Sequence, residues 1–371
     1  MNNAPLAEAV PEIAPAPALE VRRRSALVEF ALNRPKVLNA FSDDMRRVLA
    51  QQLPEIARNP DIYVVALTST SSRAFCAGGD VKALLAEARR DIKTAKAFFA
   101  GEYALNWLLE CFSKPVVSLA DGLCMGSGVG LSAYNTHRVA AENYKFAMPE
   151  TAIGLFPDVG ASHILSRLPW PLGLYLGLTG RVIDRADAYW LELVTHCIPA
   201  DRFAAILAAL SDAQPVDPLL DDMHQAPGTG PLQAQASMIG DLFGAGSLDD
   251  IVAQLKRATG AQKAFADATL AELAKKSPTS LRITDQHIRS SRGRELRETL
   301  QRDYRIACRC LAAPDFAEGV RAALIDKDGA PRWSPAALAD VTPEQVAHFF
   351  APLEDGELQL PTRIEMQAAR V

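Results

Sequence analysis

Two carboxylates lie close together in an apolar stretch that glycine and proline interrupt. Residues 148–160 read Met-Pro-Glu-Thr-Ala-Ile-Gly-Leu-Phe-Pro-Asp-Val-Gly, and the two acids are Glu150 and Asp158. Apolar surroundings disfavour the ionised form of a carboxyl group, so each acid needs either a hydrogen-bonding partner or a role in which a raised pKa is useful. The pattern indicates acid–base or nucleophilic chemistry at these side chains.

Two glycine-rich turns precede these acids in the chain. Residues 77–79 read Ala-Gly-Gly and residues 126–128 read Gly-Ser-Gly, and each turn follows a predicted buried strand. Because glycine accepts positive φ and has no side chain, the backbone of such a turn can approach a ligand closely. One N–H from each turn can then hold a thioester oxygen as it becomes an oxyanion. Acids beside an amide cradle indicate acyl chemistry, although the spacing alone equally fits two ordinary strand-to-helix turns.

Other chemistries fit the sequence less well. Neither turn has the pattern of a P-loop or of a dinucleotide-binding fingerprint. The pair Cys308 and Cys310 lacks a second pair of ligands nearby, so no metal site is predicted. The histidines at positions 137, 163 and 196 have no matching serine or aspartate in a triad spacing.

Short apolar runs alternate with helix-period segments after about residue 19, which is typical of strands joined by crossover helices. Strands are predicted over residues 26–32, 63–68, 116–120, 137–141 and 144–148. Helices are predicted over residues 42–58, 81–90, 92–112 and 181–210. The strand over 116–120 runs directly into the second glycine turn, and the strand over 144–148 leads to Glu150. This pattern predicts an α/β fold.

Composition divides the chain into three parts. Residues 1–18 are rich in Ala and Pro and are predicted to form a disordered tail. Residues 19–210 form the predicted α/β core, and residues 211–371 form a mostly helical region that opens with a segment rich in Pro, Gly and Asp. Two long amphipathic helices are predicted in this region, over residues 242–275 and 281–312.

Charge and composition exclude several classes of partner. The 371 residues carry a formal net charge of −5, so no basic excess is present to neutralise nucleic-acid phosphates. No apolar run approaches the roughly 20 residues that span a bilayer, and no membrane partner is expected. The six cysteines have no framework-like spacing, which predicts reduced thiols and a cytoplasmic location.

Several distinctive short segments, each different from the others, occur along the chain after the predicted tail. They are residues 33–40, 75–80 (Phe-Cys-Ala-Gly-Gly-Asp), 98–103 (with Phe98-Phe99 and Glu102-Tyr103), 125–131, 148–160, 277–281, 315–321 and 324–328. Together they resemble the crotonase (enoyl-CoA hydratase/isomerase) superfamily. Within it they look most like the 3-hydroxyisobutyryl-CoA hydrolases, and the resemblance covers nearly the whole chain.

The resemblance implies a crotonase-like spiral of ββα turns with a helical C-terminal region, and an acyl-CoA thioester as substrate. It also implies an oxyanion hole of two backbone amides, which fall on Gly79 and Ser127. The family usually has glycine at the second position, so the Ser127 side chain is a departure that affects the shape of the pocket. Glu102 matches a substrate-contact position of the family. No metal or redox cofactor is implied, because CoA is part of the substrate.

The acids distinguish the subclasses of the superfamily. Its hydratases resemble one another in carrying one glutamate at the position of Glu150 and another two residues after the last glycine of the second turn, where this chain has Gly130. The resemblance to the hydrolases implies that Glu150 attacks, or activates attack on, the thioester carbonyl by way of an enzyme-bound anhydride. Asp158 then binds the substrate hydroxyl and assists proton transfer. The expected reaction is hydrolysis of 3-hydroxyisobutyryl-CoA in valine breakdown.

Alternatives remain open at this point. A hydratase or isomerase of the same fold can use Glu150 alone as its base, and a non-catalytic acyl-CoA-binding protein can share the architecture. Glu150 can also cap a turn and Asp158 can form an Asx turn, both of them structural roles. A homo-oligomer is a further open point: crotonase relatives often assemble through the region after the core, which here the C-terminal segment can cover.

Overall fold

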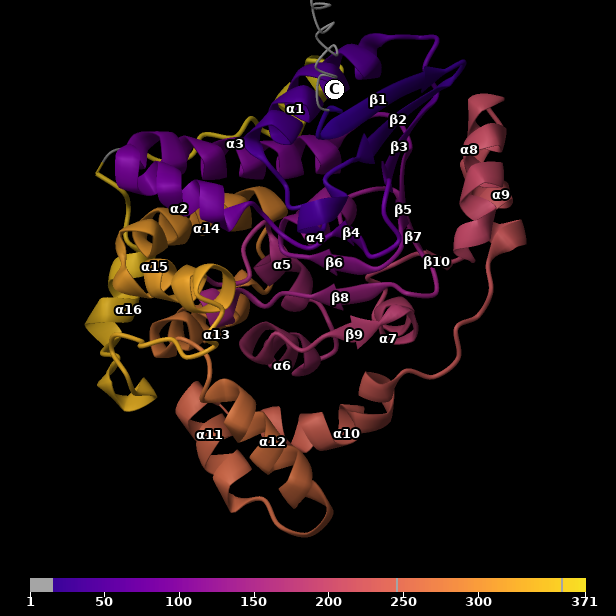
Figure 1. Ribbon diagram of the computed structural model, residues 1–371. Coiled ribbons are helices and arrows are strands. Elements are labelled where there is room, and N and C mark those ends of the chain that lie inside the picture. The colour runs from indigo at the N-terminus through magenta and orange to yellow at the C-terminus, as the bar shows by residue number, and fades with distance from the viewer. Residues whose placement is uncertain (1–15, 245, 355) are drawn as a thin grey trace, which may run out of the picture.

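Two β-sheets and a large set of helices build the molecule (Figure 1). The computed structural model describes residues 16–244, 246–354 and 356–371, so residues 1–15 of the predicted tail lie outside the described residues. Within these described residues, strands occur only up to Cys197, and the chain beyond Ala200 is helical or irregular. The α/β fold with a helical C-terminal region is therefore confirmed.

The first sheet contains six strands in the order β1-β2-β3-β5-β7-β10, of which β1 and β2 are antiparallel and the others parallel. Its members are β1 (Leu19–Arg24), β2 (Leu27–Leu32), β3 (Val64–Ser69), β5 (Val116–Ala120), β7 (His137–Ala140) and β10 (His196–Cys197). Strands β2 and β5 are buried over their whole length, as the near-continuous apolar runs predict for a sheet covered on both faces.

The second sheet is smaller and has the order β4-β6-β8-β9. Its members are β4 (Ala74–Cys76), β6 (Leu123–Met125), β8 (Lys145–Ala147) and β9 (Ile183–Asp184). The sequence prediction ran the apolar strands directly into the glycine turns and missed β4 and β6, because three residues are too few to show an alternating pattern. The chain passes from the first sheet to the second and then into a helical segment three times, at β3–β4, β5–β6 and β7–β8. This repeated passage is the predicted spiral of ββα turns.

Within the described residues, seven α-helices precede strand β10, and the first three match the helices predicted over residues 42–58, 81–90 and 92–112. The seven are α1 (Asp43–Arg58), α2 (Val81–Arg90), α3 (Ile92–Cys111), α4 (Ser127–Ser132), α5 (Ala161–Leu165), α6 (Leu172–Thr179) and α7 (Arg185–Trp190). The Ser42 side chain caps α1 by accepting a hydrogen bond from Met45 N, and Asp43 and Asp44 favour the helix start electrostatically. The apolar stripe of α1 is buried against the core, as its period predicts.

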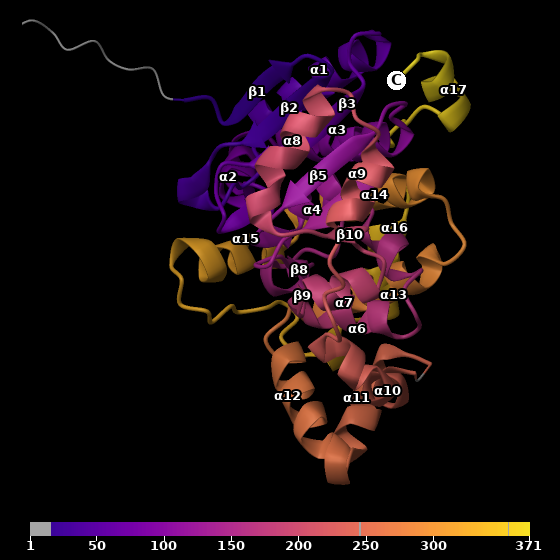
Figure 2. The same ribbon diagram turned by 90° about the vertical axis from the view of Figure 1, so that its right-hand side faces the viewer.

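The predicted helix over 181–210 is wrong as one element. Strand β10 interrupts it, so that α7 and α8 (Phe203–Ser211) are separate helices. Helix α8 and the following α9 (Val216–Met223) lie across the face of the first sheet that is opposite to α1 and α3 (Figure 2). The apolar side chains of α8 and α9, including Ile206 and Leu220, pack there against buried residues of the strands.

The C-terminal region consists of helices that are shorter than predicted. They are α10 (Pro231–Phe243), α11 (Leu248–Arg257), α12 (Lys263–Leu273), α13 (Pro278–Ser291), α14 (Leu296–Ala312), α15 (Pro314–Val320), α16 (Pro343–Phe350) and α17 (Arg363–Ala368). The predicted helix over 281–312 is broken at Gly293, which has a φ of 76°. The one over 242–275 is broken before α11, where Ser247 and Asp250 form a capping box, and again before α12.

These helices cover the α/β core within the same chain. Helix α14 packs against α3, and α13 packs against α5 and α6. Helices α10, α11 and α12 extend away from the core at the bottom of Figure 1. Leaving aside the residues outside the described ranges, none of the helices has both the length and the apolar character that crossing a bilayer requires.

Candidate active site

Three neighbouring strands of the second sheet end at the same edge. Strands β4, β6 and β8 are parallel, with Cys76 paired to Cys124 and Met125 paired to Ala147. The segment after β4 contains the first glycine turn, the segment after β6 contains the second, and the segment after β8 contains Glu150. Parallel pairing therefore brings the two turns and the acid together, although they are far apart in sequence.

The two glycine turns are in contact with each other and with Glu150. A methyl group added to Gly79 would lie 3.0 Å from Ser127 Oγ, and one added to Gly126 would lie 2.8 Å from Glu150 Oε1. The same added group on Gly126 would lie 3.3 Å from the Cα atom of Gly78. Gly78 and Gly126 also have positive φ values of 120° and 50°. Only glycine combines this backbone conformation with such close approach.

The two predicted donors carry amides that the protein itself leaves available. Within the described residues, the backbone N–H groups of Gly79 and Ser127 donate to no protein acceptor, whereas the neighbouring Asp80 N donates to Phe41 O at 2.9 Å. Asp80 in turn caps α2 and pairs with Arg34 at 2.9 Å, which fixes the first turn. Arg34 is thus engaged in holding the turn.

Glu150 is a buried carboxyl group with an unsatisfied oxygen. It begins a short 3-10 helix, η2 (Glu150–Ile153), its exposed fraction is 6%, and its Oε2 atom has no hydrogen-bond partner. The pKa of Glu150 is raised to about 8, mainly by burial, and the charge of the nearby Glu102 carboxyl contributes in the same direction. A carboxylate in such a site is a strong base and nucleophile once it ionises.

Two more buried acids surround Glu150. Burial raises the pKa of Glu102 to about 7, while the Ser127 side chain and Arg46 offset part of the rise. Burial also raises the pKa of Asp158 well above its usual range, and the charges of Glu102 and Glu150 add to this effect. Asp158 Oδ2 accepts a hydrogen bond from the Tyr103 hydroxyl at 2.7 Å. The structure thus places all five predicted site residues in one neighbourhood, while their roles stay predictions.

The position of Gly130 has no room for an acid. A methyl group there would lie 2.8 Å from Asn106 Nδ2 and 2.9 Å from Val159 Cβ. The Asn106 amide is itself fixed, because it donates to Gly130 O at 3.0 Å. A glutamate at this position would have to displace Asn106 and the segment next to Asp158. The packing, and not only the residue type, therefore opposes a second glutamate of the hydratase kind.

The C-terminal region supports the segment that carries Glu150. Ser277, which caps α13, donates from its backbone N to Thr151 O at 3.0 Å and from its hydroxyl to Asp315 Oδ2 at 2.5 Å. A methyl group on Gly154 would lie 2.3 Å from the Asp315 backbone. Residues in the segments 277–281 and 315–321 thus act through packing and hydrogen bonds against η2.

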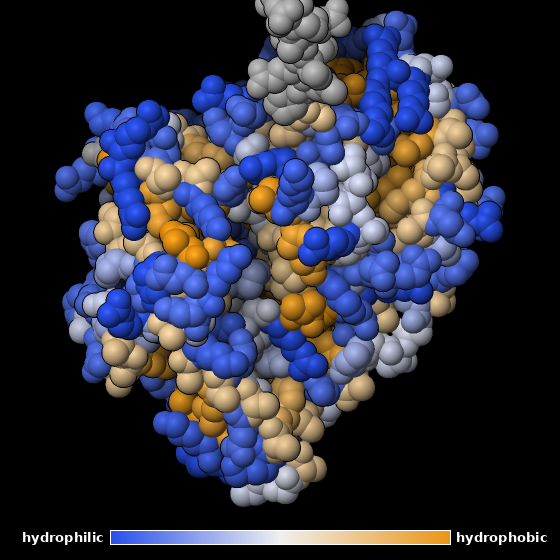
Figure 3. Space-filling view, viewed as in Figure 1, coloured by the Kyte–Doolittle hydropathy of each residue, from blue (hydrophilic) through white to orange (hydrophobic). Residues whose placement is uncertain are grey.

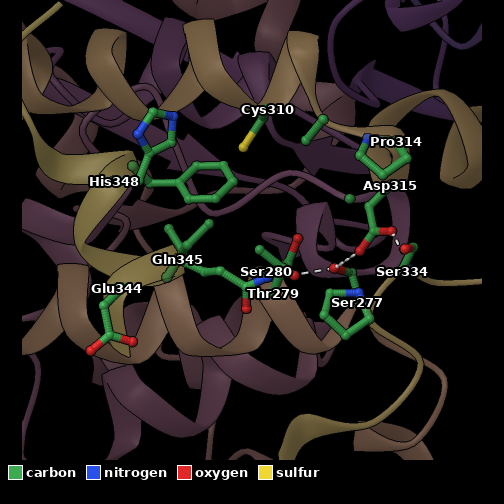
Figure 4. Close-up of a pocket in the computed structure, with 15 residues that line it drawn as sticks. Ser277, Thr279, Ser280, Cys310, Pro314, Asp315, Ser334, Glu344, Gln345 and His348 are labelled. Atoms are coloured by element: carbon green, nitrogen blue, oxygen red, sulfur yellow. Dashed lines mark hydrogen bonds between the residues drawn. The ribbon is translucent and has the colours of Figure 1, made fainter. Parts of the chain in front are cut away.

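A cavity of about 440 Å³ lies beside this support and is distinct from the site of the acids. Its lining comes from α13, α14, α15 and α16 and includes Ser277, Cys310, Asp315 and His348 (Figure 4). Neither Glu150 nor Asp158 lines it. On the face shown in Figure 3, the surface is also hollowed near its centre, between the C-terminal helices and the core. Strands β6 and β8 lead toward this central hollow in the matching view of Figure 1.

Sequence reasoning missed residues that hold the site from outside. In the sequence, Tyr103 was noted only as the residue next to Glu102, and no role was predicted for it. Asp303 and His287 are fully buried and bonded to each other at 2.5 Å. Asp303 lies on the buried stripe of α14 with Leu296 and Leu300, and an acid in such a stripe is the signal that could have found it.

The model of a family described as Enoyl-CoA hydratase/isomerase matches residues 27–350. The chain is 39% identical to "3-hydroxyisobutyryl-CoA hydrolase, mitochondrial" of Xenopus tropicalis over 339 residues, which cover 89% of this chain and 87% of the frog protein. It is 38% identical to "3-hydroxyisobutyryl-CoA hydrolase 1" of Arabidopsis thaliana over 361 residues, which cover 94% of this chain and 95% of the plant protein.

Two solved structures have the same fold over their whole length. The crystal structure of a carnitinyl-CoA dehydratase from Mycobacterium thermoresistibile has a TM-score of 0.86 and 35% sequence identity, and the match covers 92% of this chain and 98% of that chain. The crystal structure of an enoyl-CoA hydratase from Rhodobacter sphaeroides 2.4.1 has a TM-score of 0.86 and 34% identity, with 93% and 100% covered. The names of the similar proteins therefore include hydrolysis, hydration and dehydration.

The buried carboxyl of Glu150 has a testable cost in stability. Its pKa is about 8 in the folded protein and about 4.3 in an unfolded chain. Between these values the folded protein keeps a proton that the unfolded chain has released, so stability falls as pH rises through this window. The substitution Glu150→Gln should therefore raise the melting temperature by about 2–4 °C at pH 8.5 and much less at pH 5. Thermal melts at both pH values test this, and an equal gain at the two would contradict it.

Proposed function

The chain belongs to the enoyl-CoA hydratase/isomerase family, and we propose that within this family it is a thioester hydrolase that cleaves 3-hydroxyisobutyryl-CoA into 3-hydroxyisobutyrate and CoA. The observation that carries the proposal is the shared strand edge, where Gly79 and Ser127 present available amides beside the buried carboxyl of Glu150. This is the arrangement that acyl transfer requires: donors for a developing oxyanion and a carboxylate next to them.

Each step has a group to perform it. The amides of Gly79 and Ser127 hold the thioester oxygen, and their hydrogen bonds strengthen as the carbonyl becomes an oxyanion; one such donor is worth about 2.7–4 kcal/mol at the transition state. The Glu150 carboxylate attacks the carbonyl carbon, the C–S bond breaks, and CoA leaves as a thiolate that takes up a proton. The resulting anhydride between Glu150 and the acyl group is hydrolysed by water, which restores the carboxylate.

Asp158 and Glu102 serve the polar end of the acyl group in this proposal. Asp158 is fixed by Tyr103 and binds the substrate hydroxyl, and it exchanges a proton with the leaving group or the attacking water. Glu102 lies beside Ser127 and contributes its charge to the pKa of both other acids. A substrate with a hydroxyl group satisfies buried carboxyls that an unsubstituted acyl chain would leave unpaired.

Hydration is the second candidate, because the two similar solved structures are titled as a hydratase and a dehydratase. The packing around Gly130 disfavours hydration, since Asn106 and Val159 fill the space where the side chain of the second glutamate of a hydratase would begin. A hydratase that uses Glu150 alone would still release no thiol, so the product distinguishes the two.

The wider setting of the reaction is also proposed. Hydrolysis of 3-hydroxyisobutyryl-CoA belongs to valine breakdown and requires no metal or redox cofactor in this scheme. The cytoplasmic location stays a prediction; the similar frog protein is named as mitochondrial, and that word describes the frog protein. Helices α13 and α14 pack on the core within one chain.

Release of free CoA is the direct test of the proposal. With 3-hydroxyisobutyryl-CoA, a thiol-reactive dye should register CoA formation, and Glu150→Gln should lower kcat by about 10²–10⁴-fold because the attacking group is lost. A change in enoyl-thioester absorbance without free thiol would identify a hydratase. Tight CoA binding with no turnover across short acyl-CoA esters would identify a binding protein instead.

The pH dependence should reveal the buried carboxylate. Glu150 acts in its ionised form, and its pKa is about 8, so kcat/KM should rise with pH through the range of about 7–9. An exposed glutamate would instead give a rise near pH 4.5. In Glu102→Gln the midpoint should move to lower pH, because Glu102 raises the pKa of Glu150. An unchanged midpoint in this variant would show that the two acids are not coupled.

A single methyl group in the second turn should disable the site. In Gly126→Ala the new Cβ would lie 2.8 Å from Glu150 Oε1, at a φ of 50° that side chains rarely adopt. We expect kcat to fall about 10²-fold, because both the carboxylate and the adjacent Ser127 amide must move. Gly240→Ala in α10 is the matched control, since its Cβ meets nothing within 4 Å. Equal activity of the two variants would contradict the assigned geometry.

A further inference from the structure

Val159, directly after Asp158, has an unusual backbone conformation. Its φ is 51°, in the left-handed region that β-branched residues avoid, and the next residue, Gly160, has a φ of 76°. Val159 is buried, and its Cβ lies against the place where a Gly130 side chain would begin. Such a conformation persists only when the surrounding structure determines it, so the contacts of this segment call for an explanation.

Both ends of the peptide between Val159 and Gly160 are held by side chains. The Tyr134 hydroxyl donates to Val159 O at 2.6 Å, and Gly160 N donates to Asp303 Oδ2 at 2.7 Å. Tyr134 comes just after α4, and Asp303 comes from α14, so two different parts of the fold grip one peptide group. Both hydrogen bonds are short; the one to Asp303 is buried, and the one from Tyr134 is partly buried.

Asp303, which accepts the hydrogen bond from Gly160 N, is itself held by a second side chain. Asp303 Oδ1 accepts from His287 Nε2 at 2.5 Å, and both residues are fully buried. His287 belongs to α13 and packs edge-on against Phe156, which precedes Asp158. The catalytic segment is therefore contacted on both sides of Asp158 by residues of the C-terminal region. The position of Gly160 also has no room for a side chain, because a Cβ there would lie 2.1 Å from the Tyr134 hydroxyl.

We propose that Tyr134, Asp303 and His287 are positioning residues that hold the Val159–Gly160 peptide in its unfavourable conformation and thereby keep Asp158 in place for the reaction. This group of three residues is called the peptide clamp. It acts through the backbone and touches no substrate. The inference rests on the proposed function, since it assigns the clamp a purpose through the role of Asp158.

The alternative is that the three residues only stabilise the fold. A hydrogen bond with a purely structural role can be made to a relaxed backbone. Here both hydrogen bonds are made to the peptide of Val159, a residue with a strained φ that directly follows Asp158. Relaxation of Val159 would rotate the backbone on the C-terminal side of Asp158, while the bond to Tyr103 would hold only the carboxyl end. The two roles therefore predict different kinetics for a mild change in the clamp.

The test uses Tyr134→Phe, which deletes one hydroxyl and keeps the ring. We expect kcat to fall about 10-fold or more and KM to rise by a smaller factor, because the displaced Asp158 serves both proton transfer and binding of the substrate hydroxyl while the rest of the pocket is intact. Amide exchange of the peptide that contains Gly160, followed by mass spectrometry without substrate, should accelerate at least about 5-fold. Tyr175→Phe in α6 is the control, since it removes a different tyrosine hydroxyl. That hydroxyl accepts a hydrogen bond from the Arg181 side chain at 2.8 Å.

A pair of substitutions at Asp303 adds a conservative rescue. Asp303→Asn keeps an oxygen that can accept from Gly160 N, and its amide nitrogen can donate to His287 Nε2 when that ring carries its proton on Nδ1, so kcat should stay within about 3-fold of the wild type, whereas Asp303→Leu should lose activity as Tyr134→Phe does. Equal kcat and unchanged exchange in Tyr134→Phe and Tyr175→Phe would overturn the clamp. Absence of thioesterase activity in the wild type would instead refute the proposed function, and the exchange data would still decide whether the peptide is held.

Discussion

The parallel pairing of β4, β6 and β8 is the constraint on which the rest of the site depends. These strands have three residues each, and their register, with Cys76 opposite Cys124 and Met125 opposite Ala147, sets which residues leave the sheet at the common edge. A slip by one residue would turn the strand side chains to the other face and separate the amide of Gly79 from that of Ser127. Each of these short strands directly follows a strand of the first sheet in the chain, which ties the positions of the two sheets together.

Burying three carboxyl groups at the site lowers the stability of the folded protein, and the rest of the fold must offset this loss. Glu102, Glu150 and Asp158 are buried together; the charge of Glu102 raises the pKa of both other acids, and that of Glu150 raises the pKa of Asp158. Removing water makes the carboxylate more reactive but makes the folded protein less stable at neutral and alkaline pH. The large apolar core and the C-terminal helices supply the compensation, and they also fix the geometry: Ser277 supports the segment of Glu150, and Asp303 holds the segment of Asp158.

Much of this could be predicted from the sequence, and the limits have a physical cause. Helix α1 and strand β5 have periods and caps that identify them, and the motifs placed Gly79, Ser127, Glu102, Glu150 and Asp158 as candidates before any coordinates. Strands β4 and β6 are too short to show a period. The contact between Gly160 and Asp303 joins residues 143 positions apart, which no local pattern records. Gly293, where the predicted long helix breaks, could be seen in the sequence. A single glycine, however, is not enough to predict that a helix ends there.

The vibrational frequency of the bound thioester carbonyl tests the central claim most directly. With 3-hydroxyisobutyryl-CoA carrying ¹³C at the carbonyl, bound to Glu150→Gln to prevent turnover, isotope-edited infrared difference spectra isolate this one bond. Two backbone donors at Gly79 and Ser127 polarise the carbonyl, so its stretch should move to lower wavenumber than in solution. A bound carbonyl with the solution frequency would show that the two turns do not grip this oxygen and would contradict the assigned site.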